Sequence, residues 1–281
     1  MKLARALRGL SGLSLRGLLL ALAALWLLPV LGLFVASLRT PAANAASGWW
    51  TALAAPGQLT FQAYLRLAGD PGFLGAALNS ILIALPATAG LAVVAALAAY
   101  ALAWLPVRGR DALFLLILAL LVVPLQVALI PVAGLYQRLG LFGRIPGVVG
   151  FHIAFGLPFA VFLLRNAFAG LPAELLEAGR MDGAGDLRLF WHVVLPLSGP
   201  TLASLLVFQF LWVWNDLLVA LVFASPASAP LTVFLREQLR QFGANIDILA
   251  PGAFLQMLVP LVVFLACRRR FTEGLLAGSL R

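Results

Sequence analysis

Six apolar stretches, each long enough to cross a lipid bilayer, dominate this sequence of 281 residues. They lie at about 17–38, 73–104, 112–133, 147–166, 200–223 and 248–267. A helix rises about 1.5 Å per residue, so about 20 apolar residues cross a hydrocarbon core of about 30 Å. The stretches do not alternate apolar and polar residues, as the strands of a membrane β-barrel would. The sequence therefore predicts an all-α, polytopic membrane protein with six transmembrane helices, and a single transmembrane domain over residues 1–281.

The charged residues predict the orientation of the chain. Only 10% of the residues are charged, whereas soluble domains are about a quarter charged. The net charge of +9 would suit a polyanionic partner. With a cytoplasmic N-terminus, however, thirteen of the 19 Lys and Arg residues fall on cytoplasmic segments, which is the positive-inside bias. The basic balance therefore predicts cytoplasmic N- and C-termini and no nucleic-acid partner. The six outer arginines are Arg39, Arg66, Arg138, Arg144, Arg236 and Arg240.

The N-terminus resembles a secretory signal, with basic residues, an apolar run and then Ala43-Asn44-Ala45. The apolar run from Gly17 to Leu38 exceeds the roughly 7–15 residues of a signal core, so we expect a retained first span. One cysteine, Cys267, excludes an internal disulfide. The two histidines, His152 and His192, have no metal-ligand spacing and are expected to serve packing or local hydrogen bonds.

Polar residues inside the apolar stretches are candidates for a substrate pathway. A carboxylate in mid-membrane costs about 2.5–3.5 kcal/mol, so such a residue should face a cavity or a partner. The equally weighted alternative is structural, in which Asn215 and Asp216 hydrogen-bond between spans. Pro124 and Pro131 interrupt the third stretch, and such breaks are tolerated where freed backbone groups find other partners. The pathway candidates are Asn79, Gln126, Gln209, Asn215, Asp216 and Gln256.

A polar segment at about 169–198 separates the fourth and fifth stretches and holds four of the ten acidic residues. Pro172 suits a first helical turn, and Glu174 and Arg180 complement the two ends of the helix dipole. These signals predict a helix over 172–181, ended by Gly183, which adopts positive φ without penalty. A second helix is expected over 186–194, with Asp186 as N-cap and an end before Pro196.

The simpler interpretation of this segment is an amphipathic loop lying on the inner leaflet. Its acidic residues disfavour that interpretation, because an anionic leaflet attracts Lys and Arg. The spacing of Gly179 and Gly183 also matches a helix-dimerisation motif, which needs an apolar context that is missing here. Leu171, Leu175, Ala178 and Met181 share one face of the predicted first helix, so the segment is better suited to docking a soluble partner.

The pattern Glu177-Ala178-Gly179, then Gly183, then Val193 and Leu195-Pro196 resembles the EAA loop of ABC importer permease subunits. Gly179 replaces the second alanine of the family pattern and Val193 replaces isoleucine. Further landmarks extend the resemblance to the carbohydrate-uptake permeases of the maltose type, specifically their smaller six-span subunit. These landmarks are Asn79-Ser80, Leu139-Gly140-Leu141, Trp214-Asn215-Asp216 and Phe271 followed by Gly274 and Gly278.

The resemblance implies a type I ABC importer permease fold in a bacterial inner membrane. It implies three kinds of partner: a second permease subunit, two cytoplasmic ATP-binding subunits and an extracytoplasmic solute-binding protein. The chain has no Gly-Lys-Ser/Thr phosphate loop, so ATP hydrolysis is expected on the partner, with no enzyme activity and no cofactor here. The residues that the resemblance assigns to ATPase coupling are Glu174, Glu177, Ala178, Gly179, Asp182, Gly183, Leu195 and Pro196.

Three functions other than sugar permease are open to a chain of this kind. One is an ABC permease for a different solute, such as glycerol-phosphate or a polyamine. Another is an ion-coupled secondary transporter, which should carry acidic or basic relays in several spans; Asp216 alone does not make one. The last is a membrane-embedded enzyme, which should cluster acids or histidines at a membrane face. The acidic residues of 169–198 fit a docking helix better than a metal site.

Overall fold

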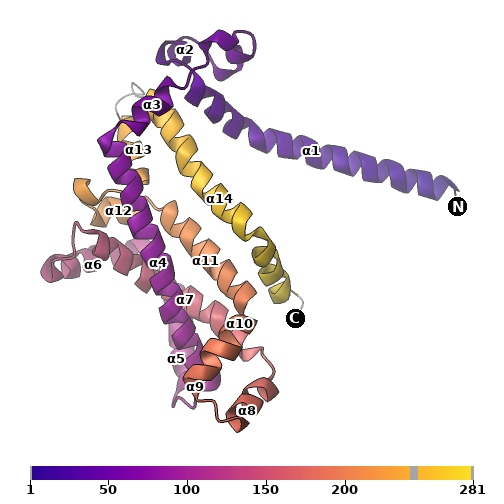
Figure 1. Cartoon of the computed structure of the whole chain (residues 1–281), viewed down its shortest axis with the longest axis vertical. Helices are drawn as coiled ribbons and strands as arrows, with labels where there is room; N and C mark the ends of the chain where they lie inside the picture. Colours follow the sequence, from indigo (N-terminus) through magenta and orange to yellow (C-terminus); the bar gives the residue numbers. More distant parts are fainter. Residues whose placement is uncertain (1, 241–245, 280–281) are drawn as a thin grey trace. The chain divides into compact units, whose positions relative to one another are not determined.

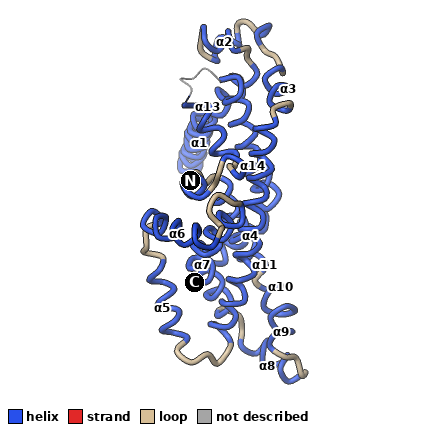
Figure 2. The backbone as a smooth tube through the Cα atoms, turned by 90° about the vertical axis from the view of Figure 1, so that its left-hand side faces the viewer, coloured by secondary structure: helices blue, strands red, loops and turns tan. Residues whose placement is uncertain are grey.

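A computed structural model describes residues 2–240 and 246–279, and within these residues every segment is helix or loop (Figure 2). Figure 1 labels the helices in chain order. The chain divides into two compact units. Unit 1 comprises Met1–Phe73 and Leu235–Met257, and unit 2 comprises Leu74–Phe234 and Leu258–Arg281. Three helices are divided between the two units. The helix α4 (Pro71–Trp104) starts in unit 1 and continues in unit 2, α13 (Leu231–Arg240) starts in unit 2 and ends in unit 1, and α14 (Ile246–Ser279) starts in unit 1 and continues in unit 2.

Unit 1 contains the long helix α1 (Lys2–Leu38) and a group of short elements that follow it. These are α2 (Pro41–Ala46), η1 (Trp49–Leu53), η2 (Pro56–Gln58) and α3 (Gln62–Ala68). The short helix α3 begins at Gln62, and the Thr60 hydroxyl accepts from the Gln62 amide at 3.2 Å. Arg39, predicted only as an outer charge, is buried, with 1% of its surface exposed.

Arg39 organises the segment between α1 and α3. Its Nε donates to Oε1 of Gln58 at 2.8 Å, and its Nη2 donates to the carbonyl of Ala43 at 2.7 Å. Further donations reach the carbonyl and the hydroxyl of Ser47 at 2.8 and 2.7 Å. A guanidinium offers five donors in a fixed plane, so one side chain satisfies several loop oxygens at once.

Unit 2 is a helical bundle in which α5 (Arg110–Leu120), α11 (Gly199–Trp214) and α12 (Leu218–Phe223) pack on α7 (Ile145–Ala169). The remaining elements are α6 (Leu125–Leu139), α8 (Ala173–Met181), α9 (Asp186–Leu189), η3 (Phe190–Val194), α10 (Leu195–Leu197) and η4 (Pro226–Ser228). Buried apolar residues form two clusters. The first joins α4, α7 and α11 to the α8–α10 segment, and the second includes residues of α4, α6, α7, α11 and α12.

Four helical segments of the described residues are long and apolar enough to cross a membrane, and six are obtained if each of two bent pairs is one span. The four are Leu15–Leu38, Pro71–Trp104, Ile145–Ala169 and Ile246–Arg268. One bent pair is α5 with α6, which turn by 100° next to Pro124, where proline removes an amide donor and disfavours helix in the preceding residue. The predicted third span is thus a broken one.

The prediction of one continuous fifth span over 200–223 is wrong. The helix α11 ends at Trp214, and α12 begins only at Leu218. The second bent pair lies at the other end of this span, where Asp186–Leu197 and Gly199–Trp214 meet at 78°. The break after Trp214 has a polar cause, because the Asp216 carboxylate caps the amides that open α12.

Candidate coupling site

The residues that predicted helix α8 lie at its two ends in the structure. Pro172 lies immediately before its first residue, Glu174 is in its first turn and Arg180 in its last turn. Gly183 follows with φ of 80°, in the left-handed region. The Gly183 amide donates to the carbonyl of Arg180 at 3.0 Å, and the Ala184 amide donates to that of Gly179 at 3.0 Å. This paired closure is the Schellman motif, and it confirms Gly183 as the turn between two helices.

The two helices of the segment pack through Gly179. A Cβ placed on Gly179 would lie 2.5 Å from Cδ2 of Leu189, a side chain with 1% of its surface exposed. The glycine therefore allows the close approach of α8 and α9. Nη2 of Arg180 lies 3.2 Å from Oδ1 of Asp186, and the Tyr100 hydroxyl of α4 donates to the same oxygen at 3.5 Å. The Arg180–Asp186 pair is half exposed, so it contributes at most about 1 kcal/mol.

Two details of the predicted second helix are wrong. Gly185, not Asp186, occupies its N-cap, because the Asp186 carboxylate instead faces Arg180 and Tyr100. The helix also does not stop before Pro196 but continues through η3, one π-helical turn, into α10. In an α-helix a proline ring clashes with the carbonyl four residues before it. The wider π turn precedes Pro196, and such turns accommodate an irregularity without ending the helix.

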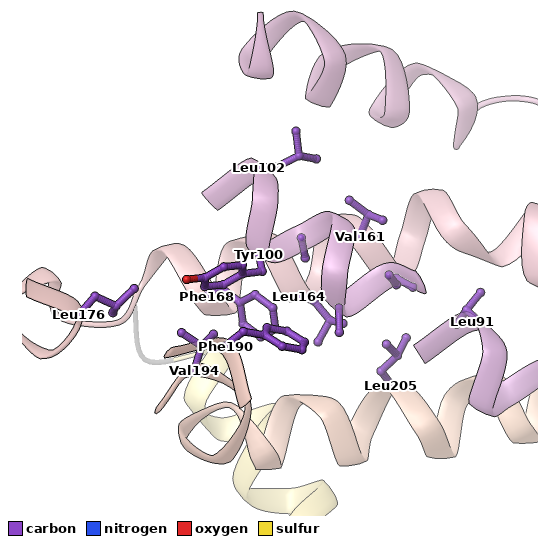
Figure 3. Close-up of a cluster of buried hydrophobic side chains, with 14 residues drawn as sticks. Leu91, Tyr100, Leu102, Val161, Leu164, Phe168, Leu176, Phe190, Val194 and Leu205 are labelled. Carbon is purple, nitrogen blue, oxygen red and sulfur yellow. The ribbon is translucent and has the colours of Figure 1, made fainter. Parts of the chain in front are cut away.

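The inner face of the segment belongs to the first apolar cluster (Figure 3). Leu176 and Val194 have no exposed surface, and Phe190 has 2%. Phe190 packs on Tyr100 of α4 with ring centroids 5.3 Å apart. The same cluster contains Leu164 and Phe168 of α7 and Leu205 of α11, so the α8–α10 segment is joined to three long helices by buried side chains.

The outer face of the segment exposes three large apolar side chains of α8 and α9. The exposed fractions are 44% for Leu175, 90% for Met181 and 66% for Leu187. Of the residues expected to contact an ATPase, those on the exposed surface are Glu174, Glu177, Ala178, Asp182, Gly183 and Pro196. Gly179 and Leu195 are half-buried: Gly179 lies against Leu189, and Leu195 packs on the first apolar cluster. The arrangement combines an accessible outer surface with an inner face fixed in the bundle.

The structure brings together only some of the pathway candidates. Gln209 and Asp216 both approach His152 of α7: Nε2 of Gln209 donates to the His152 carbonyl at 3.4 Å, and Oδ2 of Asp216 lies 3.7 Å from Nε2 of His152. Asn79 is elsewhere, donating to the carbonyls of Ala227 and Ala229 at 3.0 and 3.1 Å.

The other candidates do not share this position. Gln126 and Asn215 are exposed, and Asn215 donates to the carbonyl of Leu211 in its own helix at 2.8 Å. Gln256 lies on α14 within unit 1, half-buried. The cavity beside His152 and Asp216 has a volume of about 10 Å³, which suits one water molecule and no sugar ring. His152 and Ser80, which also line this cavity, were not among the candidates; the signal for His152 was a lone titratable residue in an apolar span.

Comparison with known proteins identifies the family. Residues 89–275 match the family described as the binding-protein-dependent transport system inner membrane component. The chain is 47% identical over 269 residues to the osmoprotective compounds uptake permease protein GgtD of Synechocystis sp., covering 94% of this chain and 90% of that protein. It is 32% identical over 259 residues to the trehalose transport system permease protein SugB of Mycobacterium tuberculosis, covering 91% and 92%.

A third relative is the alpha-glucoside transport system permease protein AglG of Rhizobium meliloti, 46% identical over 233 residues, covering 80% of this chain and 61% of that protein. Among solved structures, a crystal structure of a bacterial ABC transporter that imports the polysaccharide alginate contains a chain with a TM-score of 0.76 and 23% identity, covering 92% of this chain and 95% of that chain. This likeness supports the importer permease fold. The protein is therefore a multi-pass membrane protein that belongs to the family of binding-protein-dependent transport system inner membrane components, the permease subunits of ABC importers.

Proposed function

We propose that this chain is a permease subunit that forms half of the pathway for a sugar or sugar-like solute and couples it to a separate ATPase through the α8–α9 segment. The supporting observation is the two-sided construction of that segment. Its inner residues Leu176, Phe190 and Val194 are buried against α4, α7 and α11, whereas Met181 and Leu187 are exposed. The names of two relatives, an alpha-glucoside and a trehalose transport system permease protein, support the solute class.

In the proposed mechanism, the exposed side of α8 and α9 sits in a cleft of a cytoplasmic ATP-binding subunit. Met181, Leu187 and Leu175 supply the apolar centre of this contact, and Glu177 pairs with a basic residue of the ATPase at its rim. Because the inner side is packed into the bundle, displacement of α8 moves side chains of α4, α7 and α11 rather than sliding past them.

The complete importer in this proposal contains a second permease subunit, two ATP-binding subunits and an external solute-binding protein. Both termini of this chain face the cytoplasm. Alternating access follows: closure of the ATPase pair moves the coupling segments and opens the pathway outward. Hydrolysis on the partner then resets the inward-facing state. Among the pathway candidates, Gln126 and Asn215 are exposed and best placed to contact the solute.

The coupling proposal is tested by two substitutions, Glu177→Lys and Gly183→Asp. We expect both variants to reach the membrane at normal levels, to lose co-purification with the ATPase, and to lose solute uptake. Asp111→Lys is the matched control, because Asp111 is an exposed carboxylate, 81% accessible, in the first turn of a different helix, α5. Normal uptake together with normal ATPase co-purification in both test variants would remove the coupling role of this segment.

The solute class is tested separately with the cognate solute-binding protein. We expect it to bind neutral disaccharides or glucosides, and we expect those sugars to stimulate ATP hydrolysis by the assembled importer in proteoliposomes. Glycerol-3-phosphate and a polyamine serve as competing ligands. Stimulation by either of these, with no response to neutral sugars, would reject the sugar assignment and leave the permease assignment intact.

A further inference from the structure

The start of α12 is held by one carboxylate inside the bundle. Oδ1 of Asp216 accepts from the Val219 amide at 3.3 Å, and Oδ2 accepts from the Ala220 amide at 3.0 Å. Only 10% of the Asp216 side chain is exposed. Because this buried carboxylate caps the first amides of α12, it favours the start of a new helix there and so a break in the fifth apolar stretch.

The histidine beside this carboxylate lacks a direct partner at one ring nitrogen. His152 lies on α7 with 3% of its surface exposed, and its Nε2 is 3.7 Å from Oδ2 of Asp216. That distance exceeds a hydrogen bond, and within the described residues Nε2 has no hydrogen-bond partner. An unsatisfied buried polar group costs about 1–3 kcal/mol, so a further partner is expected at this nitrogen.

A small cavity adjoins both groups. Its volume is about 10 Å³, and its lining includes Ser80 of α4, His152 and Asp216. The Ser80 hydroxyl accepts from the Leu231 amide at 2.8 Å and donates to the Ala76 carbonyl at 3.1 Å. A hydroxyl has two lone pairs, so one acceptor position of Ser80 remains. Three polar groups around the space of about one water are what a buried water requires.

The same network holds the outer loop that follows α12. The Thr232 hydroxyl of α13 donates to the backbone carbonyl of Asp216 at 2.7 Å. Ser80 holds the neighbouring amide of Leu231, and the Ser225 hydroxyl donates to the Gly143 carbonyl at 2.8 Å. The segment 216–232 is therefore attached to α4, α7 and the loop before α7, and His152–Asp216 is the contact of this set that involves titratable side chains.

We propose that one water molecule in this cavity joins His152, Asp216 and Ser80 by hydrogen bonds. We propose that this network holds the break between α11 and α12 in place against α7 during transport. Nε2–H of His152 donates to the water, which donates to Oδ2 of Asp216 and to Oγ of Ser80. His152 and Asp216 are positioning residues, because the solute is too large for the cavity. The effect on transport rests on the proposed function, whereas the water and the position of α12 do not.

The network is tested first without any solute. Cys267 is the single cysteine of this chain, so Val219→Cys in a Cys267→Ser background gives the chain one reporter at a position with no exposed surface. Labelling is read on this chain after it is separated from its partners. In the assembled importer we expect slow labelling by a small maleimide, and at least about tenfold faster labelling when Asp216→Asn or His152→Phe is added. His152→Phe leaves the cap of α12 intact, so it carries the test if Asp216→Asn fails to reach the membrane. Unchanged labelling in the folded variants overturns the positioning role.

Asp70→Asn is the matched control for the charge change. Asp70 also caps a helix, with Oδ1 accepting from the amides of Gly72 and Phe73 at 2.7 and 3.1 Å. We expect this variant to leave the labelling rate at Val219→Cys within about twofold of its parent. The water itself is expected as a density peak within hydrogen-bond distance of His152 and Asp216 in a high-resolution electron cryomicroscopy map. A map that resolves other buried waters but none here overturns the bridge.

Transport measurements complete the test. The number of solute molecules moved per ATP hydrolysed is expected to fall at least about fivefold in Asp216→Asn and in His152→Phe. The transport-to-ATP ratio of the double variant should be no lower than that of the more impaired single variant, because both changes break one network. Multiplied losses in the double variant, or a loss of transport in strict proportion to folded protein, reject a shared positioning role. Absence of sugar transport in the parent importer rejects the proposed solute instead, and the labelling result still stands.

Discussion

Leu189 lies against the one backbone position of α8 that has no side chain, Gly179: a Cβ there would sit 2.5 Å from Cδ2 of Leu189. The family pattern carries alanine at this place, and the structure explains how glycine serves here. A leucine methyl fills the space that the alanine methyl would occupy. The two helices of the coupling segment are thereby held together by a pair of residues, and a change at either one affects the other.

This pairing predicts the effect of Gly179→Ala. Alanine favours the helix by about 0.8–1 kcal/mol over glycine. It must also displace a leucine methyl, and crowding a packed site costs about 1–3 kcal/mol. Since the end of a leucine side chain can shift, we expect a net change in the free energy of unfolding within about 1 kcal/mol. Gly179→Val should be clearly less stable, as judged by the thermal unfolding midpoint of the purified chain in detergent. Equal midpoints for Gly179→Ala and Gly179→Val would contradict the close contact.

At the Gly183 turn, backbone conformation rather than side-chain packing determines which substitutions are tolerated. Its φ is 80°, and no atom outside its neighbours lies within 4 Å of an added Cβ, so the backbone conformation alone resists a side chain. Left-handed backbone costs an ordinary L-residue about 1–2 kcal/mol, and asparagine tolerates it better than valine. We expect Gly183→Asn, which keeps the turn and lacks the negative charge that Gly183→Asp places on the docking surface, to retain most ATPase co-purification. We expect Gly183→Val to lose it. The same retention in both variants would show that the left-handed turn is not required for docking.

The buried Arg39 predicts local unfolding in unit 1. Its guanidinium donates hydrogen bonds to oxygens of Ala43, Ser47, Thr51 and Gln58. A lysine has one ammonium group with three donors, so it cannot make all of these hydrogen bonds at once. We expect Arg39→Lys to destabilise the segment 40–60 by about 2–3 kcal/mol, because the carbonyls of Ala43 and Ser47 and several side-chain oxygens share one buried donor group. Limited proteolysis in membranes, followed by mass spectrometry, should locate new cleavage between residues 40 and 60. Arg138→Lys, an exposed arginine of α6, provides the control and should cleave as the parent does.

Asn79 offers a direct comparison of the structural and pathway hypotheses. Both of its donated hydrogen bonds reach backbone carbonyls of the loop before α13, up to 150 residues away in sequence. Each such bond contributes about 0.5–1.5 kcal/mol. We therefore expect Asn79→Ala to lower the unfolding midpoint while the KM for solute stays within about twofold. A KM raised tenfold at an unchanged midpoint would instead assign Asn79 to the pathway.

The exposed Arg180–Asp186 pair predicts a small effect. The two side chains are 44% and 51% accessible, and exposed pairs contribute about 0–1 kcal/mol. Arg180→Ala should change the free energy of unfolding by less than about 1 kcal/mol, and moderate salt should leave the parent equally stable. A larger loss, measured by chemical denaturation in detergent, would mean that the pair holds α8 on α9.

Several features followed from the sequence by itself, and all of them depend on neighbouring residues. Apolar length placed the membrane-spanning stretches, and Pro172, Gly183 and the dipole-compatible charges placed α8 within one residue of its observed start. These features depend on the restricted backbone of proline, the free backbone of glycine and the length of a helix that crosses lipid. All three act over a few neighbouring residues or one helix, so the sequence alone predicts them. The spacing of Glu177, Gly183 and Pro196 was sufficient to indicate the family.

The tertiary structure alone decided which polar groups meet. The break of the fifth span at Asp216, the contact of Gly179 with Leu189 and the continuation of the helix through Pro196 were not expected. Each depends on residues brought together by packing: His152 is 64 positions from Asp216 in the chain, and Tyr100 is 86 from Asp186. An aspartate in an apolar stretch can cap a helix beside a buried histidine or line a pathway, and the sequence around it does not distinguish the two roles. Burial and distance distinguish them, and those quantities exist only after the helices have packed.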